Sequence, residues 1–295
     1  VVLHPVERVA GFPATVEHVD GKTVETKFPE IIDPLQPMMN LRAITHEPHP
    51  GVRVSCRMDG DTFEMEDQRN WMDASYKTYV RPLGLPWPYT LKDGETLDQT
   101  VTVTVNAAER GAASPTAGGA TLRLGGEEGT IPPLGFGLEP ELAECTLAAV
   151  SLLKTATPHH VLVHYDARRG AREKILEAGE KVAIGVGAEP WLELVVSDLD
   201  NFAAEIAGTG AAAAALGSPF ATVLVAPAPD LESTLPGSVW PPCPPLAEVY
   251  AATRKAFPSA RLGGGMFSYF TELNRKRPPL GEIDLVTFTN SSVVH

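Results

Sequence analysis

Short apolar runs alternate with amphipathic segments through residues 134–289, and this alternation limits the possible folds more than any other feature of the sequence. The runs do not alternate internally with polar residues, which is typical of parallel strands buried on both faces. The apolar runs span residues 134–138, 161–165, 192–196, 222–226, 261–270 and 285–289, and the amphipathic segments span 141–153, 171–186, 199–216 and 246–257. The pattern predicts a parallel sheet whose strands are connected by helices.

Two architectures fit such β-α repeats, a doubly wound sheet and a (β/α)8 barrel. No GxGxxG motif follows the first strand, because Gly135 and Gly137 lie within the apolar run itself, and this disfavours a dinucleotide-binding sheet. A complete barrel takes roughly 250 residues, more than residues 134–295 supply. We therefore expect a TIM-type barrel that is truncated after about six strands, with two strands missing at the C-terminal end.

The first part of the chain has the pattern of an all-β domain. Residues 100–105 alternate strictly between Thr and Val, and Asp-Gly pairs at residues 20–21, 59–60 and 93–94 are typical turn signals. These features predict an N-terminal β-sandwich. We place the β-sandwich domain at residues 1–125 and the incomplete barrel domain at residues 126–295.

Composition narrows the classes of partner. The 295-residue chain has a formal net charge of -13, which disfavours nucleic acids and anionic membrane surfaces. It has no apolar run of the ~20 residues that a spanning helix needs, and no signal-peptide pattern at its start. Three widely spaced cysteines give no disulfide framework, and no HxH or HExxH pair indicates a metal. We expect a cytoplasmic protein without a cofactor that handles a small molecule; a divalent metal, which no spacing supports, and the oligomeric state stay open.

The carboxyl ends of the barrel strands are the expected place for catalytic residues. The fifth apolar run leads into Glu272, Asn274 and Arg275, a carboxylate beside amide and guanidinium donors. Such a group can act as a general base or bind sugar hydroxyls. A salt bridge that only stabilises the rim of the barrel is the structural alternative.

Three further candidates lie at other strand ends. Glu139 follows the first apolar run and Asp166 follows the second, where either is a substrate-binding carboxylate or an ordinary helix N-cap. His295 follows the sixth run and is a candidate general base or metal ligand.

Residues 63–77 combine charged, amide and aromatic side chains in a region that otherwise resembles plain β-sheet. Buried polar groups cost free energy unless they are paired, so this segment is either a self-satisfied polar network or one wall of a site. As a site, it would bind a polyhydroxylated ligand through Glu66, Asp67, Arg69 and Asn70, with Trp71 as an apolar platform.

Two motifs resemble a known family. The run FEMEDQRNWMDASYKTY followed by RPLGLPWPY, and the segment GGGMFSYFTELNRKRPP with the later run DLVTFTNSSVVH, are similar to bacterial D-apionate lactonases. The resemblance spans residues 8–295. It implies a β-sandwich, a TIM barrel and, in full-length members, a further C-terminal β domain. It also implies hydrolysis of a branched-pentose aldonolactone to its acid.

Opening a lactone requires an activated water, an oxyanion stabiliser and an acid for the leaving hydroxyl. Our hypothesis uses Glu272 as base or acid, Asn274 and Arg275 as donors, and His295 or a further acid as the second titrating group. Without a GxSxG elbow, and with no cysteine at a strand end beside an obvious base, a water nucleophile is favoured over an acyl-enzyme.

Two alternatives stay open. A glycoside hydrolase would pair Glu272 with Glu139 or Asp166 across a glycosidic bond. A non-catalytic carbohydrate-binding protein would keep the aromatic and polar groups without a base.

Overall fold

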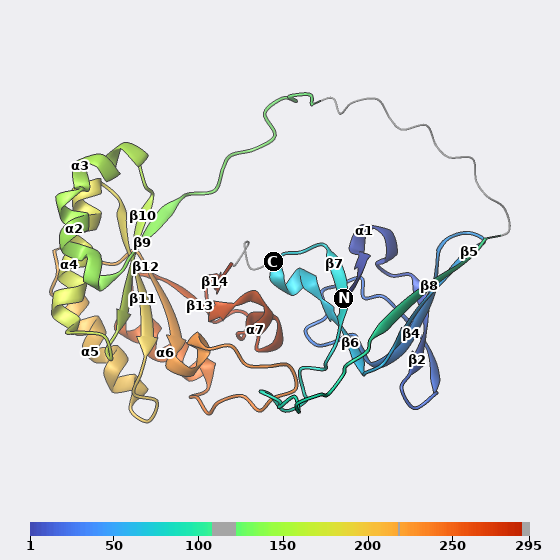
Figure 1. The fold of residues 1–295 in the computed structure, drawn as a ribbon. Helices are drawn as coiled ribbons and strands as arrows, with labels where there is room; N and C mark the ends of the chain where they lie inside the picture. The colour runs from blue at the N-terminus through green and yellow to red at the C-terminus, as the bar shows by residue number, and fades with distance from the viewer. Residues whose placement is uncertain (108–121, 218, 291–295) are drawn as a thin grey trace. The chain divides into compact units, whose positions relative to one another are not determined.

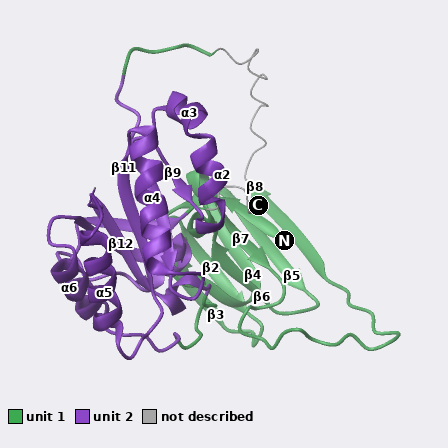
Figure 2. Cartoon of the chain, turned by 90° about the vertical axis from the view of Figure 1, so that its left-hand side faces the viewer, with its two compact units in different colours: residues 1–127, 234–239, 290–295 green, residues 128–233, 240–289 purple. Residues whose placement is uncertain are grey.

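The computed structural model describes residues 1–107, 122–217 and 219–290. The chain forms two compact units (Figures 1 and 2). The first contains residues 1–127, 234–239 and 290–295, and the second contains residues 128–233 and 240–289.

The first unit is built on an antiparallel sheet of eight strands. The path β1-β7-β6-β4-β2-β3 is extended by β5, which pairs with β4 and with β8. The strands are β1 Val2–Pro5, β2 Pro13–His18, β3 Thr23–Lys27, β4 Met38–His49, β5 Val52–Asp59, β6 Phe63–Asp67, β7 Ser75–Tyr79 and β8 Thr100–Ala107. Two short helices, α1 Val6–Val9 and η1 Gln68–Trp71, complete it.

One long strand, β4, pairs with β2, β5 and β6 and so links the strands into one sheet, which differs from the two separate sheets expected of a sandwich. β4 pairs with β6 at Met38 and Leu41 and with β5 from Ala43 onward, and Asn40, between the two residues that pair with β6, has φ 53. The left-handed conformation at Asn40 accompanies a register shift within the pairing of β4 with β6. The all-β prediction for this region is confirmed, whereas hydrogen bonds link its described strands into one sheet.

The second unit contains six parallel strands in strictly sequential order, β9 to β14. They are β9 Gly135–Leu138, β10 His160–Asp166, β11 Glu189–Val196, β12 Thr222–Pro227, β13 Arg261–Tyr269 and β14 Leu285–Thr289. Sequential order lacks the reversal of a doubly wound sheet, so the curled sheet is a partial barrel.

Helices cover one face of this sheet (Figure 1). They are α2 Ala143–Ala148, α3 Val150–Leu153, α4 Arg172–Val186, α5 Phe202–Ala214 and α6 Leu246–Ala256, with short turns η2 Pro140–Leu142, η3 Lys154–Ala156 and η4 Ala228–Leu231. Gly179 lets α4 approach β10 closely, because a Cβ at that position would lie 2.3 Å from Val163 Cγ2.

A helix that the sequence analysis did not predict follows β13. The apolar run 261–270 was expected to be strand throughout, but α7 Phe270–Arg275 begins at its last residue. The candidate residues Glu272, Asn274 and Arg275 therefore lie on a short helix at the carboxyl end of β13. No helix in the described parts of the chain is long and apolar enough to cross a membrane.

Candidate active site at the carboxyl ends of the barrel strands

Glu272 lies in the first turn of α7 and is completely buried, with 0% of its surface exposed. Its Oε1 atom accepts hydrogen bonds from Ser233 Oγ at 2.6 Å and from Arg275 Nη2 at 2.9 Å. Its Oε2 atom has no hydrogen-bond partner among the described residues. A buried carboxylate oxygen without a partner is costly, and an oxygen in this state is available to accept a proton or a ligand's hydrogen bond.

Arg275 and Asn274 differ in what they contact. The Arg275 side chain is 6% exposed, and its Nε donates to the carbonyl of Thr271 at 3.1 Å, which aligns the guanidinium with Glu272. Asn274 Oδ1 instead accepts from Arg277 Nη2 at 2.9 Å. Of the two predicted donors, Arg275 is thus the one that directly contacts the Glu272 carboxylate.

A second polar cluster, which the sequence analysis did not assemble, follows on the same side of α7. Lys276 Nζ contacts both carboxylate oxygens of Asp230, at 2.7 and 2.9 Å, and lies 2.9 Å from Cys243 Sγ. The indole ring of Trp240 lies 5.7 Å from both the Arg275 guanidinium and the Lys276 ammonium. Asp230 is nearly fully buried in η4, directly after β12, so the cluster belongs to the carboxyl edge of the sheet.

The electrostatics of this cluster favour a cationic lysine. Burial lowers the pKa of Lys276, but its hydrogen bonds to Asp230 and Cys243 raise it by more, so the pKa lies above its ordinary value. Burial raises the pKa of Asp230 by more than Lys276 lowers it. The pair is therefore a buried, mutually dependent ion pair.

His164 and Glu193 form a pair on neighbouring strands. They are direct register partners on β10 and β11, and the His164 Nδ1 atom lies 2.8 Å from Glu193 Oε2. Their strand neighbours Val163, Leu192 and Leu194 pack in the helix-covered core, so these two side chains occupy the opposite face of the sheet. The hydrogen bond to Glu193 is the main reason that the pKa of His164 is raised.

The two remaining strand-end carboxylates are ion-paired. Asp166 accepts from Arg168 Nη2 at 2.6 Å and from the Arg168 backbone N–H at 2.9 Å, and Arg168 is the main cause of its lowered pKa. Glu139 lies 2.9 Å from Arg169 Nη2. Neither side chain caps a helix: the N-cap residue of α4 is Ala171, and Glu139 precedes η2 without a side-chain cap bond.

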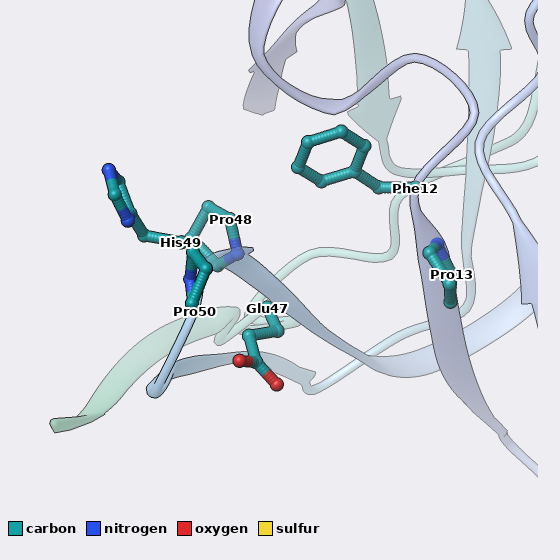
Figure 3. A pocket seen from close by; sticks show the side chains of 6 residues that line it. All are labelled: Phe12, Pro13, Glu47, Pro48, His49 and Pro50. Carbon is teal, nitrogen blue, oxygen red and sulfur yellow. The ribbon is translucent and has the colours of Figure 1, made fainter. Parts of the chain in front are cut away.

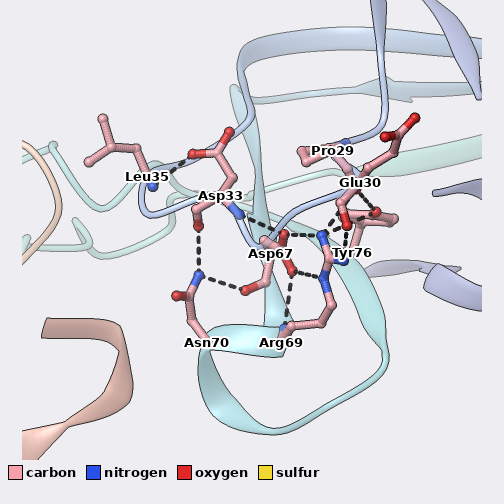
Figure 4. Close-up of polar contacts among 8 residues, drawn as sticks. All are labelled: Pro29, Glu30, Asp33, Leu35, Asp67, Arg69, Asn70 and Tyr76. Atoms are coloured by element: carbon pink, nitrogen blue, oxygen red, sulfur yellow. Dashed lines mark hydrogen bonds and ion pairs between the residues drawn. The ribbon is translucent and has the colours of Figure 1, made fainter. Parts of the chain in front are cut away.

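Asp67 and Arg69 form the centre of a network inside the first unit (Figure 4). Asp67 is 0% exposed, and both of its oxygens accept hydrogen bonds from Arg69, with one more from the backbone N–H of Asp33 at 3.0 Å. The Arg69 guanidinium also donates to the carbonyl of Glu30 at 2.8 Å and that of Pro29 at 3.0 Å. This network fastens the segment between β3 and β4 to η1.

Neighbouring side chains extend the same network. Asn70 Nδ2 donates to the carbonyls of Asp33 and Asp67, at 2.8 and 3.0 Å, and the Tyr76 hydroxyl donates to the carbonyl of Pro29. Asp67, Arg69 and Asn70 therefore have the geometry of the self-satisfied network that was one of the two interpretations of residues 63–77.

Glu66 and Trp71 lie apart from that network. Glu66 Oε1 accepts from Trp71 Nε1 at 2.7 Å, and its Oε2 accepts from Gln68 Nε2 at 2.6 Å. Glu64, two residues earlier and on the same face, accepts from the Tyr79 hydroxyl at 2.6 Å. Both glutamates therefore lie on one face of β6.

The remaining expectations concern His295, a metal site and a binding cavity. His295 lies outside the described residues. Within the described part of the chain, no group of three His, Cys, Asp or Glu side chains could hold a metal ion. A cavity of about 510 Å³ in the first unit is lined by Phe12, Pro13, Glu47, Pro48, His49 and Pro50 (Figure 3). It contains none of the predicted site residues.

The chain has an antiparallel β unit followed by a parallel sheet of barrel order, with titratable side chains at the carboxyl edge of that sheet. This arrangement defines the class of TIM-barrel proteins with an N-terminal β domain. The family models of the D-apionate lactonase N-terminal domain and TIM barrel domain match residues 1–108 and 134–295. The chain belongs to the D-apionate lactonase family, which confirms the resemblance in its motifs.

One curated relative is a D-apionate lactonase from Brucella anthropi. It is 45% identical over 296 residues, an alignment that covers all of this chain and 49% of the relative. The chain therefore spans about half the length of the curated relative it matches.

Proposed function

We propose that the protein hydrolyses a sugar aldonolactone of the D-apionolactone type to its acid, with Glu272 at the reacting centre. The observation that supports this most directly is the unpartnered Oε2 atom of a completely buried carboxylate at a strand end. Membership of the D-apionate lactonase family supports the substrate class.

In the proposed reaction, Glu272 Oε2 accepts a proton from a water molecule whose oxygen adds to the lactone carbonyl. Arg275, and Asn274 beside it, stabilise the developing oxyanion, and the carbonyl carbon then releases the ring oxygen. The Glu272–Arg275 contact at 2.9 Å keeps the carboxylate oriented while Oε2 stays available.

The leaving oxygen needs a proton donor, and His164 is suited to that role. Its contact with Glu193 raises its pKa, so the imidazolium form persists to higher pH than in an unpaired histidine. His295, the predicted second titrating group, stays a prediction. His164 and His295 are separated experimentally by substituting each one alone.

Ion pairing argues against Asp166 as the general acid of the glycoside hydrolase alternative. A general acid in such an enzyme needs a raised pKa, whereas Arg168 lowers the pKa of Asp166. Glu139 is paired with Arg169. Both carboxylates suit the substrate-binding role proposed for them better than the acid role.

We propose that the first unit packs as a β-sandwich and that the sheet of the second unit is part of a (β/α)8 barrel. Glu66 and Trp71 are the better candidates for contact with a sugar among residues 63–77, because both are partly exposed, whereas Asp67 is completely buried and bonded to Arg69.

The decisive experiment uses the full-length protein with D-apionolactone and, separately, with aryl glycosides. Acid release from the lactone is followed by pH-stat titration, and aryl release is followed by absorbance. We expect acid release that depends on Glu272 and no aryl release. Aryl release without lactone opening would replace the proposal by the glycosidase, and tight sugar binding without either reaction would indicate a carbohydrate-binding protein.

A further inference from the structure

Cys243 is the cysteine whose surroundings differ most from those of an ordinary thiol. Its Sγ atom lies 2.9 Å from Lys276 Nζ, and Asp230 holds that ammonium through both of its oxygens. Cys243 lies in the loop between η4 and α6, and Lys276 lies at the end of α7. The fold rather than the local sequence therefore brings these two residues together.

The other two cysteines serve as internal comparisons. Cys56 is buried in the apolar core of the first unit. Cys145 is exposed, and its Sγ donates to the carbonyl of Leu142 at 3.0 Å. Cys243 is partly exposed, so a small oxidant can reach it, and among the described residues it is the cysteine with an amine at hydrogen-bond distance.

This pairing favours oxidation of the thiol. The thiolate is the reactive form of cysteine, and a neighbouring ammonium stabilises it. The sulfenic acid formed by oxidation would have its oxygen within reach of the lysine nitrogen, because the nitrogen already lies at hydrogen-bond distance from the sulfur. Asp230 prevents Lys276 from moving away from Cys243.

We propose that Cys243 and Lys276 form a covalent N–O–S bridge when the protein meets hydrogen peroxide. One peroxide oxidises the Cys243 thiol to a sulfenic acid, forming the S–O bond and releasing one water. After Lys276 loses its ammonium proton to solvent, a second peroxide oxidises the pair. The N–O bond forms, and the sulfenic proton and one amine proton leave in two waters.

The bridge changes the neighbourhood of Glu272. It replaces a cation by a neutral nitrogen, so Asp230 loses its partner in a buried position. It also ties the loop to the end of α7, where the Lys276 backbone N–H donates to the carbonyl of Glu272 at 2.8 Å. Oxidation is therefore coupled to the position of the carboxylate, a consequence that rests on the proposed function.

The test is mass spectrometry of the full-length protein before and after treatment with hydrogen peroxide. We expect a linked pair of peptides containing Cys243 and Lys276, heavier than their sum by one oxygen and lighter by two hydrogens. Dithiothreitol should remove the link. Sulfinic or sulfonic acid at Cys243 without any linked peptide would overturn the proposal.

Three variants identify which two residues the link joins. Cys243→Ser should abolish it, and Lys276→Arg should abolish it while keeping a cation beside Asp230. Cys145→Ser should leave it unchanged. A link that persists in Lys276→Arg overturns the assignment of the nitrogen, and circular dichroism of each variant establishes that the fold is kept.

Activity supplies a separate readout. If the lactone assay is positive, peroxide should lower turnover several-fold in the parent protein and in Cys145→Ser, with recovery on reduction, and should not do so in Cys243→Ser. A link without any change in turnover overturns the coupling to Glu272. The mass readout needs no substrate, so it distinguishes failure of the bridge from failure of the lactonase proposal.

Discussion

Each unit contains a buried carboxylate paired with an arginine, and the two pairs differ in what they leave unsatisfied. Both carboxylate oxygens of Asp67 accept hydrogen bonds, and the Arg69 guanidinium also donates hydrogen bonds to backbone carbonyls. Glu272 is equally buried, yet the hydrogen bonds of its carboxylate within the described residues are all accepted by Oε1. Burial and ion pairing alone therefore do not distinguish a structural pair from a candidate catalytic pair. The distribution of hydrogen bonds over the two carboxylate oxygens does.

The largest expected effect is on turnover in Glu272→Gln. The amide keeps the size of the side chain but cannot accept a proton, so lactone hydrolysis should fall about 10³-fold or more. Pre-steady-state and steady-state acid release measure the loss, with Glu248→Gln on the exposed face of α6 as the matched control. Turnover close to that of the parent would remove Glu272 from the mechanism.

Arg69→Ala tests the other pair, where the expected effect is on stability. Removing the guanidinium leaves Asp67 buried without its partner, and loss of one partner of a buried pair costs about 3–5 kcal/mol. Chemical denaturation measures the change in the free energy of unfolding. KM of the folded variant should stay near the parent value, and a raised KM with unchanged stability would move Arg69 into a binding site.

Arg57→Ala is the control within the same sheet. Arg57 pairs with Glu17 and Asp59 on the surface, so its removal should cost less than about 1 kcal/mol.

A second buried polar group in the first unit predicts acid sensitivity. His4 packs against His46 and Phe28, and burial followed by the charge of His46 lowers the pKa of His4 from 6.5 to about 4. The folded state then binds fewer protons than the unfolded state, so stability is complete above pH 6.5 and falls as the pH drops toward 4. The loss approaches about 3 kcal/mol at 1.36 kcal/mol per pKa unit.

Unfolding titrations between pH 4 and 8 measure this loss. His4→Leu should flatten the pH dependence, whereas His49→Gln, at an exposed position, should leave it unchanged. A parent protein whose stability does not change over this interval would contradict the prediction.

A smaller effect on turnover is expected for His164→Gln. Loss of the proton donor should reduce lactone hydrolysis about 10²-fold and remove the alkaline limb of the pH–rate profile. Glu193→Gln should shift that limb to lower pH, because the contact that raises the pKa of His164 is weakened. His159→Gln, at the other end of β10, is the control, and a parent-like profile in His164→Gln would exclude the role.

The sequence predicted the elements of the barrel better than its site. Apolar runs mark the strands because both faces of a parallel strand are buried, and each predicted run coincides with one strand from β9 to β14. α7 was missed because Phe270 continues the apolar run of β13. In the first unit, residues 100–105 do form β8, but Val101, Val103 and Val105 are exposed, so the alternation did not indicate a buried face.

Contacts between distant residues explain what the sequence analysis missed at the site. The sequence shows no cysteine at a strand end beside an obvious base, and it does not indicate that folding brings the Lys276 ammonium to Cys243 across 33 positions. The polar network of residues 63–77 was foreseen as one of two interpretations, but its acceptors at Pro29 and Glu30 are backbone carbonyls. Every residue has a carbonyl, so such partners leave no trace in the choice of side chains.

The smallest effect is expected for Ser233→Ala, and it decides how Glu272 is used. Ser233 is exposed and donates to Glu272 Oε1 at 2.6 Å, a geometry that suits either a positioning group or a nucleophile next to its base. With water as the nucleophile, Ser233 only positions the carboxylate, and loss of a hydrogen bond to a charged acceptor costs about 1.5 kcal/mol at the low end, so turnover should fall about 10-fold. A loss comparable to that of Glu272→Gln, together with an acyl adduct on Ser233 detected by mass spectrometry, would replace the water mechanism by an acyl-enzyme. Ser259→Ala, at an exposed position before β13, is the matched control.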